Sequence, residues 1–243
     1  MQQQSLANEE IRDKIDLITD SLGKHLQGKE TSLRLSLISF FSGGHLLIED
    51  LPGLGKTTLA IGIARALGLS FGRIQCTSDL LPTDITGLSI YNKATGEFRF
   101  HRGPIFNNIV LCDEINRATP KTQSALLESM AEKQVTIEGK TYRLPDIFCV
   151  IATQNPVEHY GTFPLPESQL DRFMMKISIG YPSHKAEKMI LRIGSTQEIL
   201  HTIEPVMDPA EVKLVQEEIE KNIYVSDRIL DYVLAIVHGT RQN

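Results

Sequence analysis

The chain has 243 residues, of which 41% are hydrophobic and 23% are charged, enough for one large domain or for a core domain with a small one. A formal net charge of −5 argues against a surface built to neutralise a nucleic-acid backbone. No apolar run approaches the roughly 20 residues that cross a bilayer, and the N-terminus has no basic or apolar signal segment, so we expect a cytoplasmic protein without a membrane span.

Helical and strand-like segments alternate along most of the chain, which predicts an α/β fold. The first segment is an amphipathic helix that carries Leu6, Ile11, Ile15 and Ile18 at helical spacing. Three further helices are expected at residues 29–41, 56–67 and 120–133. Five core strands are expected at residues 45–49, 72–76, 109–113, 147–152 and 174–179.

Two hairpins and a helical tail complete this plan. The hairpins cover residues 88–100 and 134–143, and taken alone they are typical of decoration at a sheet edge. We place a boundary near Tyr181, between an α/β unit (residues 1–181) and a small all-helical unit (residues 182–243). In the second unit, helices are expected at residues 183–194, 208–221 and 226–238.

Residues 50–58 (DLPGLGKTT) join the first predicted strand to a helix and have the layout of a phosphate-binding P-loop. Gly53 and Gly55 let the backbone curl so that successive N–H groups point at phosphate oxygens. Lys56 then reaches the β- and γ-phosphates, and the Thr57 hydroxyl can ligate Mg²⁺. Asp50 stands where the usual pattern begins with Gly, and a tight turn without a ligand is the alternative interpretation. The candidate residues for binding ATP or ADP are Pro52, Gly53, Leu54, Gly55, Lys56, Thr57 and Thr58.

Two acids, Asp113 and Glu114, stand at the end of the apolar strand predicted at residues 109–113. Beside a P-loop, Asp113 can hold the hydration shell of Mg²⁺ together with Thr57. Glu114 can orient and deprotonate an attacking water, which is the work of a general base. A lone pair of acids at a strand end is more often simply solvated, but here the spacing from the P-loop favours a Mg-nucleotide site.

Asn155 and Arg172 are the remaining candidates. Asn155 follows the fourth predicted strand and can touch the γ-phosphate or the attacking water, although an Asn before Pro156 is also typical of a turn. Arg172 ends a short predicted helix between the fourth and fifth strands, away from its own P-loop. Such an Arg is a surface residue, a salt-bridge partner, or a group supplied in trans to the nucleotide of a neighbour.

Four segments in order resemble the MoxR branch of the AAA+ ATPases, and the resemblance extends from about Leu6 to the last residue. They are residues 44–58 (GHLLIEDLPGLGKTT), 113–118 (DEINRA), 152–156 (ATQNP) and 165–173 (LPESQLDRF). The resemblance implies an AAA+ P-loop core, with a five-stranded parallel sheet flanked by helices, and then a small helical lid. It also implies that Lys56 and Thr57 form Walker A, Asp113 and Glu114 form Walker B, Asn155 is sensor 1 and Arg172 is the arginine finger.

The same resemblance also implies a role for the two hairpins. The hairpin at residues 88–100 matches the helix-2 insert and that at 134–143 the pre-sensor-1 insert, both of which face the central pore in related rings. One departure concerns the lid, which in the family carries a sensor-2 Arg in a motif similar to GASPR. These 243 residues have no such motif, and Arg241 lies too close to the last helix for that role. We therefore expect an incomplete lid, from a truncated chain or from a protein that does without sensor 2.

The function implied is hydrolysis of MgATP by a ring, expected to be a hexamer, that remodels or matures client protein complexes. A partner with a von Willebrand factor A domain is also implied. A nucleotide-gated binding scaffold with little turnover is the alternative, and a nucleic-acid motor of the same fold is disfavoured by the acidic composition. A small-molecule kinase is disfavoured because Glu114 and Asn155 favour water as the acceptor.

Overall fold

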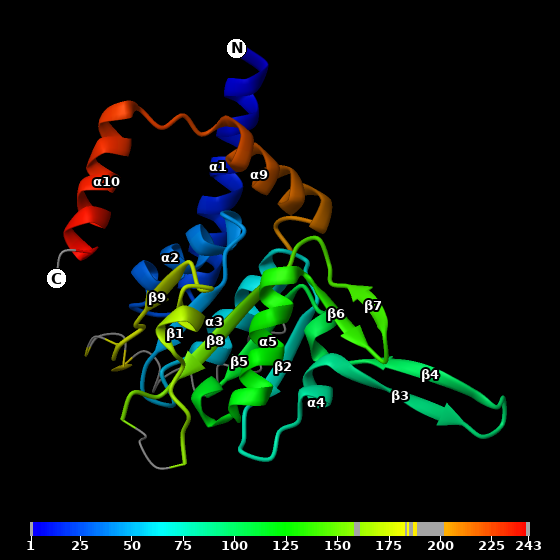
Figure 1. The fold of residues 1–243 in the computed structure, drawn as a ribbon. Helices are drawn as coiled ribbons and strands as arrows, with labels where there is room; N and C mark the ends of the chain where they lie inside the picture. Colours follow the sequence, from blue (N-terminus) through cyan, green and yellow to red (C-terminus); the bar gives the residue numbers. More distant parts are fainter. Residues whose placement is uncertain (1, 158–160, 183, 185–186, 189–201, 242–243) are drawn as a thin grey trace.

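A five-stranded parallel sheet forms the centre of the molecule (Figure 1). The computed structural model describes residues 2–157, 161–182, 184, 187–188 and 202–241. The strand order is β2-β5-β8-β1-β9, and every pair in it is parallel. The strands are β1 (Leu46–Glu49), β2 (Phe71–Gln75), β5 (Ile109–Asp113), β8 (Cys149–Gln154) and β9 (Met175–Ile177).

Helices cover both faces of this sheet, so its strands are apolar on both sides. Successive residues along β5, such as Val110 and Leu111, belong to two different buried clusters, because their side chains point to opposite faces of the sheet. One cluster packs the first face against α1 (Gln2–Gly23), α2 (Glu30–Phe41), α3 (Lys56–Ala66) and α9 (Pro209–Asn222). The other packs the second face against α4 (Pro82–Thr86), η1 (Pro104–Phe106), η2 (Ile115–Arg117) and α5 (Pro120–Glu132).

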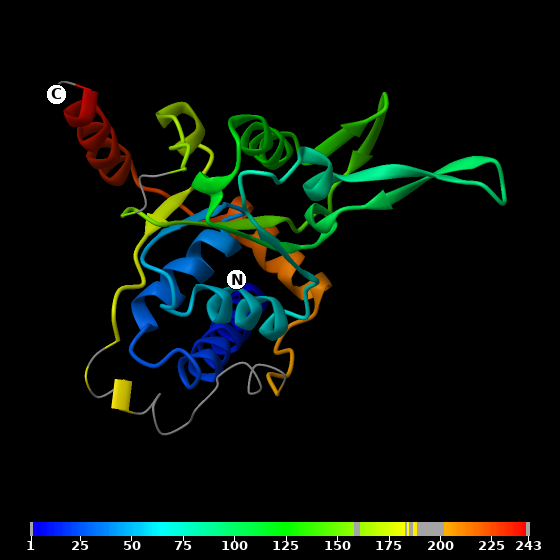
Figure 2. The ribbon, with the colours of Figure 1, turned by 90° about the horizontal axis from the view of Figure 1, so that it is seen from below.

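The two predicted hairpins are present as separate two-stranded sheets. One is β3 (Gly87–Asn92) with β4 (Glu97–Arg102), and the other is β6 (Gln134–Ile137) with β7 (Lys140–Arg143). The β3–β4 hairpin extends well away from the body of the molecule (Figure 2). Phe100 of β4 stacks on Tyr142 of β7, with ring centroids 4.3 Å apart, so the two hairpins support each other at their bases.

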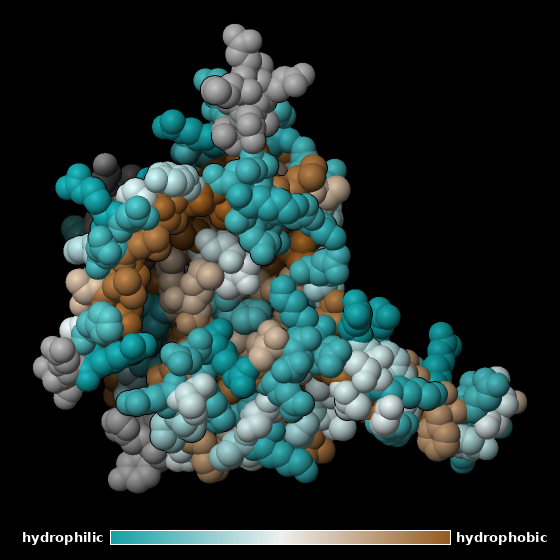
Figure 3. Space-filling model, turned by 45° about the horizontal axis from the view of Figure 1, so that its top comes forward, coloured by the Kyte–Doolittle hydropathy of each residue, from teal (hydrophilic) through white to brown (hydrophobic). Residues whose placement is uncertain are grey.

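The last two helices differ in their surroundings. Val212 and Val215 of α9 are buried in the core, whereas α10 (Asp227–Arg241) stands apart and has no buried residue (Figure 1). An apolar cavity of about 340 Å³ lies between α1, α2 and α9, and Figure 3 shows hydrophobic side chains around a hollow on this face. None of the described helices is long and apolar enough to cross a bilayer.

The five predicted strands are confirmed, with small changes at their ends. The fifth is shorter than expected, Met175–Ile177 rather than 174–179. It ends there because the N–H groups of Ile179 and Gly180 donate to the carboxylate of Asp50 instead of continuing the ladder. The helix predicted at residues 183–194 falls almost wholly outside the described residues, and the boundary near Tyr181 stays a prediction.

Candidate active site

The P-loop connects the end of β1 to the start of α3. Gly53 and Gly55 have φ angles of +83° and +90°, in the left-handed region that favours glycine. A Cβ added at Gly53 would meet nothing within 4 Å, so it is the backbone conformation that calls for glycine there. The concave loop leads directly into the N-terminus of α3, whose free N–H groups and dipole favour an anion.

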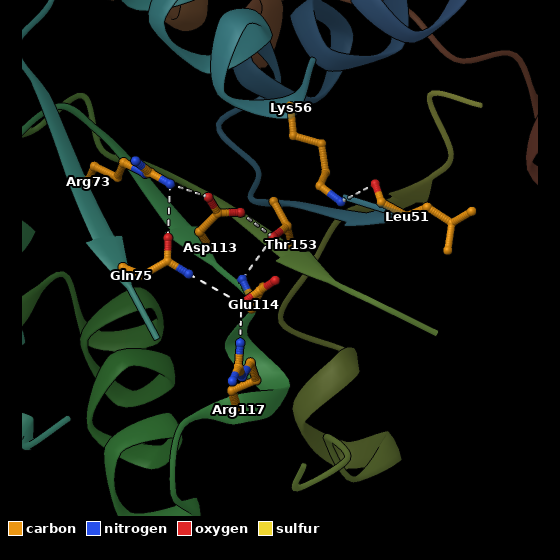
Figure 4. Close-up of polar contacts among 8 residues, drawn as sticks. All are labelled: Leu51, Lys56, Arg73, Gln75, Asp113, Glu114, Arg117 and Thr153. Atoms are coloured by element: carbon orange, nitrogen blue, oxygen red, sulfur yellow. Dashed lines mark hydrogen bonds and ion pairs between the residues drawn. The ribbon is translucent and has the colours of Figure 1, made fainter. Parts of the chain in front are cut away.

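Lys56, the first residue of α3, folds back over this loop (Figure 4). Its Nζ donates hydrogen bonds to the backbone oxygens of Asp50 at 2.7 Å and Leu51 at 2.9 Å. Burial lowers the pKa of Lys56, while the carboxylates of Asp113, Asp50 and Glu114 act in the opposite direction. The ammonium group thus has carbonyl partners that phosphate oxygens can replace.

Asp50, the departure from the usual P-loop pattern, is buried, and one of its carboxylate oxygens accepts several hydrogen bonds. Its Oδ2 accepts hydrogen bonds from Ser178 Oγ at 3.1 Å, from Gly180 N at 3.0 Å and from Ile179 N. These donors follow β9, the strand beside β1. Asp50 therefore fastens the start of the P-loop to the segment that leaves the sheet, a role that a glycine could not perform.

The two acids lie at the carboxyl end of β5, and buried Thr153 of the neighbouring β8 braces both of them (Figure 4). Thr153 Oγ1 donates to Asp113 Oδ1 at 2.8 Å and accepts from Glu114 N at 2.8 Å. Glu114 has a φ of +57°, a left-handed conformation that is uncommon outside glycine and recurs at functional sites. Thr153 was not among the residues predicted from the sequence, because a polar residue near the end of an apolar strand (CVIATQ) marks the position but not its partners.

Three further polar side chains surround these acids. Arg73 Nη2 donates to Asp113 Oδ2 at 2.8 Å and to Gln75 Oε1 at 2.9 Å. Gln75 Nε2 donates to Glu114 Oε2 at 3.3 Å, and Arg117 Nη1 donates to the same oxygen at 3.0 Å. Arg73 and Gln75 are exposed residues of β2, two positions apart, so they lie on one face of the strand next to β5. None of these three residues was among the candidates predicted from the sequence.

One cavity of about 410 Å³ brings most of the predicted residues together. It is lined by Pro52, Gly53, Gly55, Lys56, Thr57, Thr58, Arg73, Gln75, Asp113, Glu114 and Asn155. Leu54 lines a second cavity of about 200 Å³, which shares Gly53, Gly55 and Thr58 with the first and also contacts His25, Leu26, Gln27, Lys29 and Pro182. Asn155 additionally forms the expected turn, because its Oδ1 accepts from Val157 N at 3.1 Å.

Arg172 lies outside the cavity and is exposed. The short helix before it, α6 (Glu167–Leu170), ends two residues earlier than the sequence predicted. Met174 N donates to His45 O at 2.9 Å, and His45 lies immediately before β1, whereas the P-loop follows the other end of that strand. Arg172 therefore belongs to the opposite edge of the sheet from its own P-loop.

The residues of the main cavity fit a magnesium ion bound together with phosphates. The described residues contain no group of three or more His, Cys, Asp or Glu side chains that could hold a metal by themselves. Mg²⁺ does not need such a group, since it is usually held by one or two protein oxygens and by substrate phosphates. Thr57 and Asp113 line the cavity beside Lys56 and supply oxygens of that kind.

The chain also resembles known proteins in sequence and in fold. Residues 45–175 match a family described as the ATPase family associated with various cellular activities (AAA). The chain is 46% identical over 235 residues to the uncharacterized protein YeaC of Bacillus subtilis, covering 97% of this chain and 73% of YeaC. It is 44% identical over 216 residues to the chaperone MoxR1 of Mycobacterium tuberculosis, covering 88% of this chain and 56% of MoxR1. A crystal structure of a proposed ATPase from Cytophaga hutchinsonii superposes with a TM-score of 0.89 at 41% identity, covering 98% of this chain and 72% of that one.

A five-stranded parallel sheet with a P-loop after β1 and two acids at the carboxyl end of β5, together with the family match, defines an ATPase of the AAA+ class. Within that class, the chain belongs to the MoxR family, as its motifs indicated. It spans 56% of the length of MoxR1, so the activity and assembly of a whole protein are matters for proposal.

Proposed function

We propose that this protein binds and hydrolyses MgATP in the cavity beside the P-loop. The observation that carries the proposal is the single cavity that unites the left-handed glycines, Lys56 and the two acids Asp113 and Glu114. A phosphate cradle, a cation and a candidate base in one cavity are the parts that phosphoryl transfer to water needs. The second cavity shares Gly53, Gly55 and Thr58 with the first, which gives the nucleoside a place next to the phosphates.

Each residue has a separate part in this proposal. The amides of residues 53–58 and the ammonium of Lys56 bind the phosphates. Thr57 and Asp113 would hold Mg²⁺, which when bound neutralises charge on the phosphates. Glu114 takes the proton of the attacking water, and Asn155 at the rim of the same cavity orients that water.

The remaining expectations concern assembly. We propose a ring of several copies, expected to be a hexamer, in which Arg172 of one copy completes the site of the next. The position of Arg172 at the opposite edge of the sheet from its own P-loop supports a role in trans. Remodelling of a client protein is supported by the name of the relative MoxR1, a chaperone, and by the projecting β3–β4 hairpin. A von Willebrand factor A partner and a cytoplasmic location stay predictions.

A second candidate function is a nucleotide-gated scaffold with little turnover. The observation that favours it is the engagement of Glu114 Oε2 by both Gln75 and Arg117, because an oxygen that already accepts two hydrogen bonds is less available to an attacking water. The two candidates differ in turnover and share the binding site.

Calorimetry with MgATP and a steady-state ATPase assay test both candidates. The chain should bind MgATP, and Lys56→Ala should weaken that binding strongly, because it removes the ammonium that faces the phosphates. Glu114→Gln should still bind MgATP but lower hydrolysis on the order of 10²–10⁴-fold, the usual contribution of a general base. Unchanged affinity in Lys56→Ala would refute the P-loop assignment, and equal turnover in Glu114→Gln would refute the role of the base.

A further inference from the structure

Arg73 is a charged residue of the active site that the proposed mechanism does not use. It projects from β2 toward the end of β5, and its guanidinium forms an ion pair with Asp113 at 2.8 Å (Figure 4). The Arg73 side chain is 49% exposed, whereas that of Asp113 is 13% exposed. Ion pairs with so exposed a partner contribute little to folding. The placement of Arg73 therefore calls for an explanation other than stability.

Both oxygens of the Asp113 carboxylate are in use. Thr153 donates to Oδ1 from within the sheet, and Arg73 donates to Oδ2 in the wall of the cavity. Thr153 is fully buried and belongs to a central strand, so its hydroxyl is a fixed partner. Arg73 belongs to β2, the outermost strand at its end of the sheet, and its long side chain can turn toward solvent. The exchangeable partner of Asp113 is thus the guanidinium.

We propose that Arg73 is the resident counter-cation of Asp113 and that Mg²⁺ has to displace it when the nucleotide binds. A guanidinium on this carboxylate both occupies a lone pair and places positive charge where a divalent cation would approach. Arg73 therefore sets the Mg²⁺ concentration at which the site becomes loaded. The inference rests on the proposed function, because it concerns the metal that accompanies ATP.

Displacement of Arg73 from Asp113 would also affect Glu114. Arg73 also donates to Gln75 Oε1, and Gln75 Nε2 donates to Glu114 Oε2. The orientation of the Gln75 amide is consistent at both ends, since its oxygen faces a donor and its nitrogen faces a carboxylate. When Arg73 leaves, Gln75 loses the partner that fixes this orientation and its hold on Glu114 weakens. Arg73 is therefore a positioning residue that links the metal at Asp113 to the freedom of Glu114.

A Mg²⁺ titration of nucleotide binding tests this inference without measuring turnover. A fluorescent ADP analogue is bound to the protein in EDTA, and Mg²⁺ is added until the affinity reaches its limiting value. In Arg73→Gln, the midpoint of this titration should fall on the order of tenfold, which lies within the usual range of coupling between two bound species. Arg73→Lys keeps a cation beside Asp113 and should restore a midpoint close to that of the wild type.

Two control variants separate contact from charge. Arg99→Gln removes the same charge from the exposed β4 strand, outside the cavity, and should leave the midpoint unchanged. Arg117→Gln removes a cation that contacts Glu114 instead of Asp113, and should shift the midpoint less than Arg73→Gln does. A shift as large in Arg117→Gln as in Arg73→Gln would overturn the specific pairing in favour of a general field effect.

The result also separates this inference from the proposed function. If the wild type binds the analogue and responds to Mg²⁺, an unchanged or raised midpoint in Arg73→Gln overturns the inference alone. If the wild type binds no nucleotide, the proposed function fails and the inference falls with it. The thermal unfolding midpoint of Arg73→Gln should stay within about a few degrees of the wild type, because exposed ion pairs contribute little to folding.

Discussion

The two edges of the central sheet use polar residues in opposite ways. At the carboxyl edge, charged side chains lie in or beside a cavity and contact one another, as Arg73 does with Asp113 and Arg117 with Glu114. At the amino edge, His45 is buried and bonded to the main chain, accepting from Val150 N at Nδ1 and contacting Met130 O through Nε2. At the amino edge, polar groups such as His45 hold neighbouring strands together. At the carboxyl edge, polar groups stay available to a ligand. Function and stability can therefore be disturbed separately.

Arg172 gives the largest expected effect, because it would connect the amino edge of one copy to the carboxyl edge of the next. Arg172→Ala should bind ATP normally and lose on the order of 10³–10⁵ in the rate of hydrolysis, as when an arginine finger is removed. The measurement is steady-state ATPase activity under conditions in which the protein is shown to be a ring.

A mixing experiment supplies the control for this prediction. Rings assembled from Arg172→Ala and Lys56→Ala subunits should recover part of the activity, since an intact cavity then meets an intact finger at some interfaces. Co-assembled mixtures with no recovery would contradict the role in trans and leave Arg172 as a surface residue.

Thr153 combines the two uses of polar residues, because it is buried at the carboxyl edge and its hydrogen-bond partners are the catalytic candidates Asp113 and Glu114. Thr153→Val should lower the free energy of unfolding by about 1–3 kcal/mol, the cost of leaving a buried polar group without its partner. Thr153→Ser keeps the hydroxyl and should restore the hydrogen bonds to Asp113 and Glu114. Urea unfolding measures both variants, and equal stability of the Val and Ser variants would contradict the bracing role.

His45 offers an effect on stability of similar size, and the direction of its pH dependence follows from its burial. Burial lowers its pKa to about 4, from an ordinary value near 6.5. Below about pH 6.5, His45 therefore becomes protonated in the unfolded chain but stays neutral in the folded chain. The free energy of unfolding falls as the pH drops from about 6.5 toward 4. Between pH 7.5 and pH 5 the contribution of this one residue is about 2 kcal/mol.

A matched pair of variants isolates that contribution. His45→Gln removes the titration, so it should flatten the pH dependence of the unfolding free energy over this range. His101→Gln, on the exposed β4 strand, should leave the slope as it is in the wild type. Identical slopes in the two variants would show that His45 is not the source.

The P-loop and the five strands could be predicted because their signals are local. The closely spaced glycines Gly53 and Gly55 indicate a tightly curled loop by themselves. Apolar runs predict buried strands without any knowledge of which strands lie beside them. The roles of Thr153 and Arg73 could not be predicted in this way. They depend on the strand order, which places β8 and β2 on either side of β5, and no local pattern contains that order. The two final helices are both predicted from the sequence, yet α9 has residues buried against the body and α10 has none.

Asp50 gives the P-loop a mechanical property that its glycines alone would not provide. One carboxylate oxygen of buried Asp50 accepts hydrogen bonds from Ser178, Ile179 and Gly180. Lys29 Nζ donates to the carbonyl oxygens of Ile179 and Gly180. The P-loop and the segment that leaves the sheet are thereby joined by several hydrogen bonds. We expect a displacement of residues 178–180 to move the P-loop with them, and a shift of the P-loop to move residues 178–180 along the same path.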